Sequence, residues 1–309
     1  MELSVDLSKS LSLIDGENTD ELQYLEKIRY ILKNGIEKPD RTGTGIYSVF
    51  GTQMRFNIRN NIFPLLTTKR MFYRGIIEEF LWFTKGSTDA KELQKKKVRI
   101  WDGNTSREFL DSRGLTHLEE GDCGPIYGFN FRHFGAKYET CHTDYTGKGY
   151  DQLMEAVRLI REEPHSRRIL ITLWNPAQLK EVCLPPCHHT YQFWVANGEL
   201  SCFLYQRSSD FFLAGNYNLC TAVLLIHMLI KLSNCGLKPG EVIHSIGDTH
   251  IYKNHVRQCE EQLTRKPYSF PTIELNADKE YKTPEDFEYD DFKIIGYKYH
   301  PAIKAKMAV

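Results

Sequence analysis

The sequence predicts an α+β fold, a single domain built on a mixed β-sheet with helices packed against it. Strand-like and helix-like segments follow one another without the strict βαβ alternation of doubly wound proteins. The sequence contains no glycine-rich phosphate signature of the P-loop or Rossmann type, so side chains must hold any phosphate. The 309 residues are 41% apolar, enough for one large core or two small ones, and no linker or repeat divides them.

The N-terminal segment, residues 1–17, is polar and is expected to be flexible, with the folded domain over residues 18–309. Asn18 and Glu21 have the spacing of a capping box and precede apolar residues at helical intervals. Gly35 is placed to end this helix, because glycine is common just beyond helix C-termini.

The remaining elements follow from periodicity and from breakers. Asn197-Gly198 separates two strand-like runs and predicts a tight hairpin turn. Further strands are expected over residues 46–58 (bent at Gly51), 168–174, 242–252, 272–275 and 292–299. Further helices are expected over residues 74–85 (ended by Gly86), 151–163 (ended by Pro164), 218–232 and 254–263.

Charge and cysteine usage limit the possible partners. Forty Lys and Arg balance forty Asp and Glu, which argues against broad nucleic-acid or membrane affinity. Residues 222–230, the most apolar run, are too short to span a membrane, and no signal-peptide pattern begins the chain, so a cytoplasmic protein is expected. The eight cysteines include no C-x-x-C pair and no convincing zinc spacing, so we expect reduced thiols and no metal.

The run Leu184-Pro185-Pro186-Cys187-His188 is the most informative stretch. The two prolines stiffen the backbone and present one thiol, as suits a nucleophile, although a buried structural cysteine is the ordinary alternative. The Asn197-Gly198 hairpin would return Arg207 toward Cys187, and a nearby guanidinium favours the thiolate.

Four arginines lie near the ends or starts of expected strands and could clamp a phosphate bidentately. They are Arg41, Arg167, Arg168 and Arg207. For each arginine alone, a surface ion pair is the simpler interpretation.

Three further sets of polar residues are candidates, each with a structural alternative. Glu79, on an apolar helix, suits a general acid or base, or a carboxylate satisfied by a neighbour. Asn218 suits reading the edge of a base, or a helix N-cap. Asp248, His250 and Tyr252 alternate along a strand and so share one face, either to bind a sugar or as a polar rim.

Taken together, these residues closely resemble the thymidylate synthase family over residues 22–309. The resemblance rests on the ordered motifs Asp40-Arg41-Thr42-Gly43-Thr44-Gly45, Phe63-Pro64-Leu65-Leu66-Thr67-Thr68-Lys69-Arg70, Trp101-Asp102, Gly124-Pro125-Ile126-Tyr127-Gly128-Phe129, Arg167-Arg168, Leu184-Pro185-Pro186-Cys187-His188, Gln206-Arg207-Ser208, Gly247-Asp248 and Met307-Ala308-Val309. It implies a kinked mixed sheet in one catalytic domain and a homodimer joined through the sheet faces. It also implies reductive methylation of dUMP to dTMP with 5,10-methylenetetrahydrofolate, without a metal and with release of dihydrofolate.

The resemblance also implies a role for each site residue. Cys187 would add to C6 of uracil, and the residues implied to act with it in catalysis are Glu79, Tyr127, His188, Arg207 and Asp248. The residues implied to bind dUMP are Arg41, Arg207, Ser208, Asp210, Asn218, His250 and Tyr252, together with Arg167 and Arg168 from the partner subunit. The residues implied to bind folate are Ile100, Trp101, Asn104, Asp210, Leu213, Tyr217, Met307 and Ala308, the last two in a C-terminal lid.

The match departs from the family pattern at Ala214-Gly215-Asn216, where Gly-Val-Pro is usual. The added methyl and the Gly-Asn pair predict a looser backbone and altered folate binding. Three alternatives follow for the whole chain: a pyrimidine hydroxymethylase on the same scaffold, a nucleotide- or RNA-binding protein without catalysis, and a cysteine hydrolase that pairs Cys187 with His188 or His189. Neighbours in a strand point to opposite faces, which disfavours the hydrolase.

Overall fold

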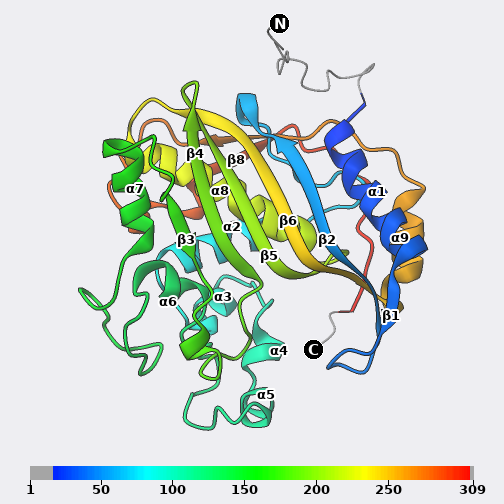
Figure 1. Cartoon of the computed structure of the whole chain (residues 1–309), viewed down its shortest axis with the longest axis horizontal. Helices are drawn as coiled ribbons and strands as arrows, with labels where there is room; N and C mark the ends of the chain where they lie inside the picture. Colours follow the sequence, from blue (N-terminus) through cyan, green and yellow to red (C-terminus); the bar gives the residue numbers. More distant parts are fainter. Residues whose placement is uncertain (1–16, 307–309) are drawn as a thin grey trace, which may run out of the picture.

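The computed structural model describes residues 17–306, in which a six-stranded sheet occupies the centre (Figure 1). Its strand order is β1-β2-β6-β5-β4-β3, and only β5 and β6 pair in parallel. The strands are β1 (Ile36–Lys38), β2 (Ile46–Asn57), β3 (Leu170–Thr172), β4 (His188–Ala196), β5 (Glu199–Asp210) and β6 (Lys238–Tyr252). Register shifts in the β4–β5 and β5–β6 pairings interrupt the regular ladder. The predicted α+β fold with a mixed sheet is therefore confirmed.

The helices pack mainly on one face and at the two sides of this sheet (Figure 1). They are α1 (Thr19–Asn34), α2 (Tyr73–Thr84), α3 (Ala90–Lys95), α4 (Asp102–Thr105), α5 (Arg107–Ser112), α6 (Tyr127–Arg132), α7 (Gln152–Glu162), α8 (Gly215–Ser233) and α9 (Val256–Leu263). Short 3₁₀ turns are η1 (Arg59–Asn61), η2 (Pro176–Gln178), η3 (Lys253–His255), η4 (Pro284–Asp286) and η5 (Tyr289–Asp291). A separate two-stranded sheet joins β7 (Thr272–Leu275) to β8 (Phe292–Ile295).

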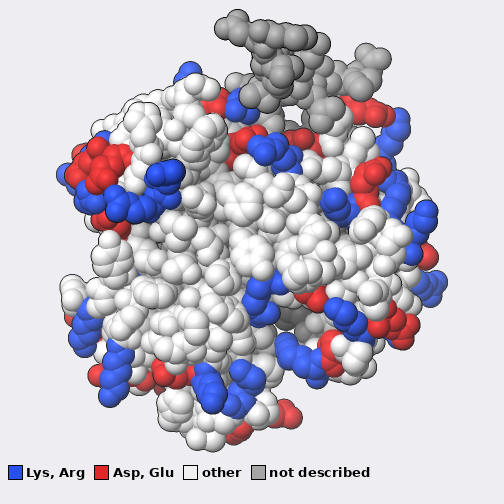
Figure 2. Space-filling model, viewed as in Figure 1, with Lys and Arg blue, Asp and Glu red and all other residues white. Residues whose placement is uncertain are grey.

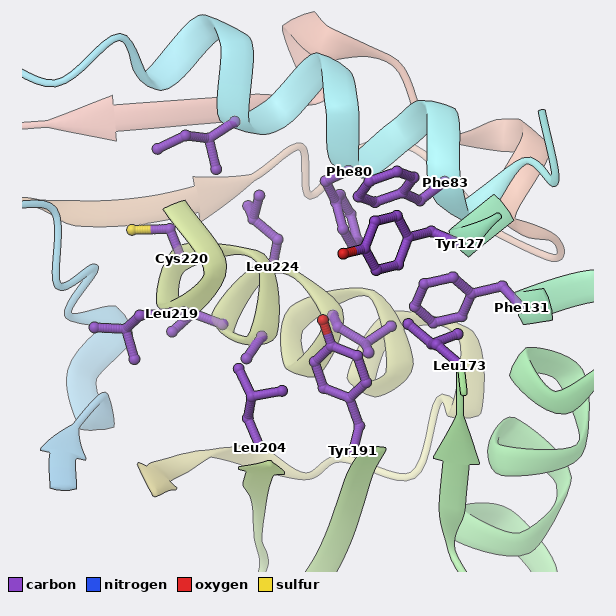
Figure 3. Packing of buried hydrophobic residues seen from close by; sticks show 14 of the residues in the cluster. Phe80, Phe83, Tyr127, Phe131, Leu173, Tyr191, Leu204, Leu219, Cys220 and Leu224 are labelled. Atoms are coloured by element: carbon purple, nitrogen blue, oxygen red, sulfur yellow. The ribbon is translucent and has the colours of Figure 1, made fainter. Parts of the chain in front are cut away.

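Helix α8 forms the centre of the core. By length and composition it could cross a membrane, yet 78% of its most apolar window is buried inside the protein. Figure 3 shows Leu219 and Leu224 of α8 in the same cluster as Tyr191 and Leu204 of the sheet. The apolar character of α8 is thus accounted for by packing against the sheet and α2.

The N-terminal cap of α1 follows the prediction in part. Asn18 Oδ1 accepts a hydrogen bond from Glu21 N at 3.1 Å, as the capping spacing requires. The Glu21 carboxylate is directed instead to the backbone and hydroxyl groups of Thr67 and Thr68, at 2.6 to 3.0 Å. Glu21 therefore ties the buried segment after β2 to the start of α1.

The hairpin between β4 and β5 confirms the Asn197-Gly198 prediction. Both turn residues have positive φ angles, 52° and 72°, as a two-residue type I′ turn needs. The two strands pair antiparallel from Ala196↔Glu199 to His188↔Gln206. Beyond the last pair, Arg207 N donates to Cys187 O at 3.0 Å, so the hairpin does return Arg207 to the thiol.

The start of α8 corrects two predictions. The helix begins at Gly215 rather than Asn218, and Asn218 N donates to Ala214 O, which places Asn218 inside the first turn and excludes an N-cap role. The expected loosening at Gly215-Asn216 is also wrong, because Asn216 is buried, donates to Pro64 O at 2.8 Å and accepts from Leu66 N at 3.2 Å. A side-chain carboxamide thus fixes the segment that family resemblance expected proline to stiffen.

The two faces of the sheet differ sharply. The inner face buries Tyr191 and Phe193 of β4 against the helices. On the outer face Trp194 is 64% exposed, and Leu170, Phe203 and Tyr205 are exposed beside it. Figure 2 shows this outer face as a broad surface with few charged residues at its centre. We call the surface formed by Leu170, Trp194, Phe203 and Tyr205 the outer aromatic face.

Candidate active site

The loop before β4 holds Cys187 through main-chain contacts with Arg207. The Arg207 guanidinium donates to Pro186 O at 2.7 Å and to Pro185 O at 2.8 Å, and lies 3.7 Å from Cys187 Sγ. The proline rings restrict the backbone at the two residues whose carbonyls accept from the arginine. The thiol is therefore positioned by a stiff loop, and hydrogen bonds from Arg207, which also contacts the thiol, hold that loop in place.

The Cys187 thiol is subject to opposing influences. Burial is the largest and raises its pKa, while the Arg207 charge, a hydrogen bond with Tyr127 and the Arg41 charge lower it. The pKa remains above its ordinary value, so the thiolate is not the resting form at neutral pH. The predicted effect of Arg207 is confirmed in direction, but burial outweighs it.

Tyr127 and His188 flank the thiol. The Tyr127 hydroxyl accepts a hydrogen bond from Cys187 N at 2.6 Å, and its ring lies 5.2 Å from the His188 ring. His188 Nδ1 is 2.6 Å from the Tyr191 hydroxyl. Burial lowers the pKa of His188 to about 4, against a smaller opposing effect of a hydrogen bond with Asn218, so the imidazole is neutral at pH 7. Asn218 thus reaches the same cluster from α8.

The adjacent glutamates of α2 have different partners. Glu78 is buried and forms an ion pair with Lys96 at 2.7 Å. Glu79 instead accepts a hydrogen bond from Trp101 Nε1 at 2.8 Å. Burial raises the pKa of Glu79 to about 7, and the indole bond only partly offsets it. Glu79 is therefore placed to exchange a proton near neutral pH.

The end of β6 presents the predicted polar row. His250 Nδ1 lies 2.9 Å from Asp248 Oδ1, and the Tyr252 ring packs edge-on against His250 at 5.3 Å. Asp248 also accepts from Ser48 Oγ at 3.0 Å. Within the described chain Asp248 thus contacts His250, and its predicted catalytic role stays a prediction. Asp210, paired with His250 in the sheet, accepts from Leu213 N at 3.1 Å.

The four arginines are divided between two places. Arg207 contacts the thiol. Burial raises the pKa of Cys187 and of Tyr252, and the Arg41 charge is a smaller effect that opposes both rises. Ser208 follows Arg207 in β5 and pairs with Asp248 in the sheet. Arg167 and Arg168 are exposed and line a hollow of about 510 Å³ with Glu162, Glu163, Pro164, His165 and Ser166. Within one chain the structure does not bring these two arginines to the Cys187 cluster.

The residues assigned to folate lie on the α2 and α8 side of the site. Trp101 packs its ring 6.2 Å from Tyr127, next to Ile100 at the start of the same turn. Asn104 is buried, and its Nδ2 has no hydrogen-bond partner among the described residues. From the other side, Tyr217 donates to Phe72 O at 3.3 Å, in the first turn after Leu213. Met307 and Ala308 lie outside the described residues.

Three neighbours were not predicted from the sequence. Trp174 lies under the Arg207 guanidinium at 5.6 Å and stacks on His189, so it supports the arginine. Behind His188, Gln206 Oε1 lies 2.7 Å from His244 Nε2, and both residues are fully buried. Gln206 belongs to the Gln-Arg-Ser motif, which could have marked it, whereas nothing in the sequence pairs it with His244.

Comparison with known proteins agrees with the geometry. The family model described as thymidylate synthase matches residues 22–309. A thymidylate synthase of Homo sapiens is 51% identical over 94% of this chain and 91% of its own length. A bifunctional dihydrofolate reductase-thymidylate synthase of Zea mays is 54% identical over 94% of this chain and 55% of its own length. A thymidylate synthase of Human herpesvirus 8 is 52% identical over 94% and 85%. The chain therefore spans about half the length of the bifunctional relatives.

Proposed function

Because the chain belongs to the thymidylate synthase family, we propose that it methylates dUMP to dTMP, with 5,10-methylenetetrahydrofolate as the donor. The observation that supports this most directly is the Cys187 cluster, in which one thiol lies 3.7 Å from a guanidinium and has Tyr127, His188 and Asn218 around it. This is the arrangement that addition of sulfur to an electrophilic ring carbon requires.

The first step forms a bond between Cys187 Sγ and C6 of uracil and places negative charge on the C5–C4–O4 system. The thiol must lose its proton for this step, and its raised pKa means that the step needs help. A bound phosphate beside Arg207 would offset part of the arginine's charge. Substrate binding therefore has to promote the attack by holding C6 in the correct geometry beside the sulfur, in addition to any effect of charge.

The nucleotide would be held from three elements. Arg41, Arg207 and Ser208 would bind the 5′-phosphate by charge-assisted hydrogen bonds. Asn218 would pair with O4 and N3 of uracil, since a carboxamide offers both a donor and an acceptor. Because His188 is neutral, its ring can either accept from or donate to Asn218, whereas an imidazolium could only donate. His250 and Tyr252 would bind the 3′-hydroxyl, with Asp248 and Asp210 behind them.

The folate supplies the one-carbon unit and the hydride, and the residues around α2 fit such a ligand. The buried Nδ2 of Asn104 has no partner among the described residues, so it can donate to a ligand beside Trp101. Ile100, Leu213 and Tyr217 would supply apolar and aromatic walls. Glu79, with a pKa near 7, would accept and return the protons that leave and join the uracil ring. Met307 and Ala308 would close the site.

A homodimer in the cytoplasm completes the proposal. The outer aromatic face is large and apolar, a character typical of surfaces that join subunits. Arg167 lines a second hollow with Trp194 and Phe203, so it borders that face. Arg167 and Arg168 would then reach the phosphate of the partner subunit across the interface. This division explains why they lie apart from Cys187 in one chain.

Product analysis tests the proposal. Purified protein would be incubated with dUMP and methylenetetrahydrofolate, following dihydrofolate absorbance and the mass of the nucleotide together. We expect dTMP and dihydrofolate in equal amounts. A nucleotide one oxygen heavier than dTMP, formed without dihydrofolate, would instead identify a hydroxymethylase. Absence of turnover, with dUMP still bound, would identify a binding protein.

A further inference from the structure

A second cluster of reactive side chains lies outside the proposed active site. Cys141 Sγ is 3.7 Å from His142 Nε2 and 3.9 Å from Glu119 Oε1, and His142 Nε2 is 2.7 Å from Glu119 Oε1. The carboxylate of Asp89 lies within 4.8 Å of the Cys141 and His142 ligand atoms. Asp89, Cys141 and His142 thus bring three donor atoms to one place, and Glu119 adjoins them through its contacts with Cys141 and His142.

We propose that Asp89, Glu119, Cys141 and His142 form a binding site for a divalent zinc-type cation. Around a tetrahedral zinc ion, with bonds of about 2.0 to 2.3 Å, donor atoms lie about 3.4 to 3.6 Å apart. The two sulfur distances, 3.7 and 3.9 Å, are close to this spacing. The shorter His142–Glu119 contact is a hydrogen bond that the ion replaces by a small opening of two partly exposed side chains.

The donor set selects the class of cation. One thiolate, one imidazole and two carboxylates suit zinc, or cobalt as its substitute, rather than calcium or magnesium, which take oxygen ligands. Binding requires Cys141 to release its proton, which leaves as the sulfur–metal bond forms, with no change of oxidation state. Lys91 Nζ, now 3.1 Å from Glu119 Oε1, is the charge that the cation displaces.

The surroundings fix two of the donors in place. Asp122 accepts a hydrogen bond from Cys141 N at 3.0 Å and others from Tyr138 and from Gly124 N. Asp89 and Asp122 form an isolated antiparallel bridge, so the Asp89 and Cys141 segments share one anchor. Such hydrogen bonds around the ligands are what holds metal sites in a defined geometry. Glu119 and His142 are about half exposed, which leaves the ion a path from solvent.

The expected role is structural. Cys123, which follows Asp122, donates from its backbone to Thr88 O at 3.0 Å, and the same segment leads through Gly124 into α6 and Tyr127. The ion would therefore link the loop over residues 139–145 to the segment that supports Tyr127. The ligands come from three distant parts of the sequence, which is why no cysteine spacing indicated the site.

Cobalt binding tests the proposal without relying on activity. Metal-free full-length protein would be titrated with Co²⁺, with absorption recorded in the near ultraviolet and visible ranges. We expect one equivalent to produce a thiolate-to-cobalt band with tetrahedral visible bands, and Zn²⁺ to remove both. Cys141→Ser should abolish the ultraviolet band, and His142→Ala should weaken binding at least about tenfold. Cys235→Ser, which removes an exposed thiol elsewhere, should change neither.

Two controls make the result decisive. Circular dichroism would confirm that each variant is folded. If Cys141→Ser does not fold, His142→Ala, which changes an exposed side chain, tests the site in its place. Zn²⁺ should raise the melting temperature of the parent protein and not that of His142→Ala. A thiolate–cobalt band that survives in Cys141→Ser, or is lost in Cys187→Ser, would overturn the proposal, as would the absence of any such band in the parent protein.

Discussion

The inner and outer faces of the central sheet are built from the same strands, yet the described residues cover the apolar side chains of the inner face and leave those of the outer face exposed. On β4, Tyr191 and Phe193 are buried against the helices, whereas Trp194 is 64% exposed on the opposite side. On β5, Leu204 is fully buried, while Phe203 and Tyr205 on either side of it are exposed. Alternation along a strand explains the two directions, but not why both sets are aromatic or apolar.

The difference indicates that the two faces have different tasks. The inner face packs on α8 and ends at the Cys187 cluster, so changes there should affect chemistry without affecting assembly. The outer aromatic face contributes no residue to that cluster within the described chain, so changes there should affect assembly first. Activity would then fail only because Arg167 and Arg168 lose access to the partner's site.

The largest effect is expected on the inner face. Cys187→Ala should reduce kcat by roughly 10⁵-fold, because no covalent bond to C6 can form. Sedimentation velocity should show an unchanged oligomer, and calorimetry should show that dUMP still binds. Substantial residual turnover in Cys187→Ala would exclude this cysteine as the nucleophile.

The outer face should give the next largest effect. Trp194→Lys places a charge in the proposed interface and should convert the dimer to a monomer, as measured by sedimentation. Activity should fall roughly 10³-fold, since two arginines worth about 1.5–3 kcal/mol each in charge-assisted hydrogen bonds are withdrawn. Tyr30→Lys, a change at an aromatic on α1 that is 51% exposed, is the matched control and should leave both readouts unchanged. An active monomer would refute the shared site.

Within the inner face, the two adjacent glutamates can be separated. Glu79→Gln should lower kcat roughly 10²-fold, because a proton-transfer group is replaced by one that cannot titrate. Glu78→Gln removes the ion pair with Lys96 and should change kcat by less than about twofold, although it costs some stability. Steady-state kinetics of both variants measure the contrast. Equal losses would mean that α2 contributes by packing alone.

The smallest expected effect is on stability as a function of pH. The pKa of Glu79 is raised from 4.5 to about 7 in the folded chain, so the folded state holds this proton more tightly than the unfolded state. Its contribution to the free energy of unfolding is present below pH 4.5 and is lost as pH rises through about 7. Glu79→Gln should remove a slope of up to about 1.4 kcal/mol per pH unit in that window. Urea unfolding at pH 5, 6 and 7 measures it, and parallel slopes in both proteins would contradict the raised pKa.

Local patterns predicted the elements whose causes lie within a few residues. The Asn197-Gly198 turn, the Asn18 cap and β7 follow from local chemistry and were correct. Helix α6 was missed, because it has only six residues and depends on a close approach: a Cβ on Gly128 would meet Ser87 O at 2.2 Å. The early start of β6 was also missed, since Pro239 and Gly240 are strand breakers in isolation and are overridden by pairing with β5.

In the candidate site, too, local patterns were informative and long-range contacts were missed. Motifs indicated Cys187, Arg207 and Asn218, and the hairpin turn placed the first two together. They could not show that burial of Cys187 outweighs its arginine, or that Trp174 supports that arginine. The backbone preferences of glycine and asparagine also suggested flexibility at Gly215-Asn216. These preferences are local and do not include the hydrogen bonds of the Asn216 side chain with Pro64 O and Leu66 N.

The parallel pairing of β5 with β6 also determines when the site can exist during translation. The β4–β5 hairpin is a local structure, so it can form once about 210 residues have left the ribosome. Its neighbour β6 ends at Tyr252 and pairs there with Ile46 of β2, more than 200 positions away. The strand that follows the Arg41 segment therefore cannot pair until β6 has emerged. Until then, the nascent chain contains Cys187 but lacks His250 and Tyr252, the residues proposed to bind the sugar.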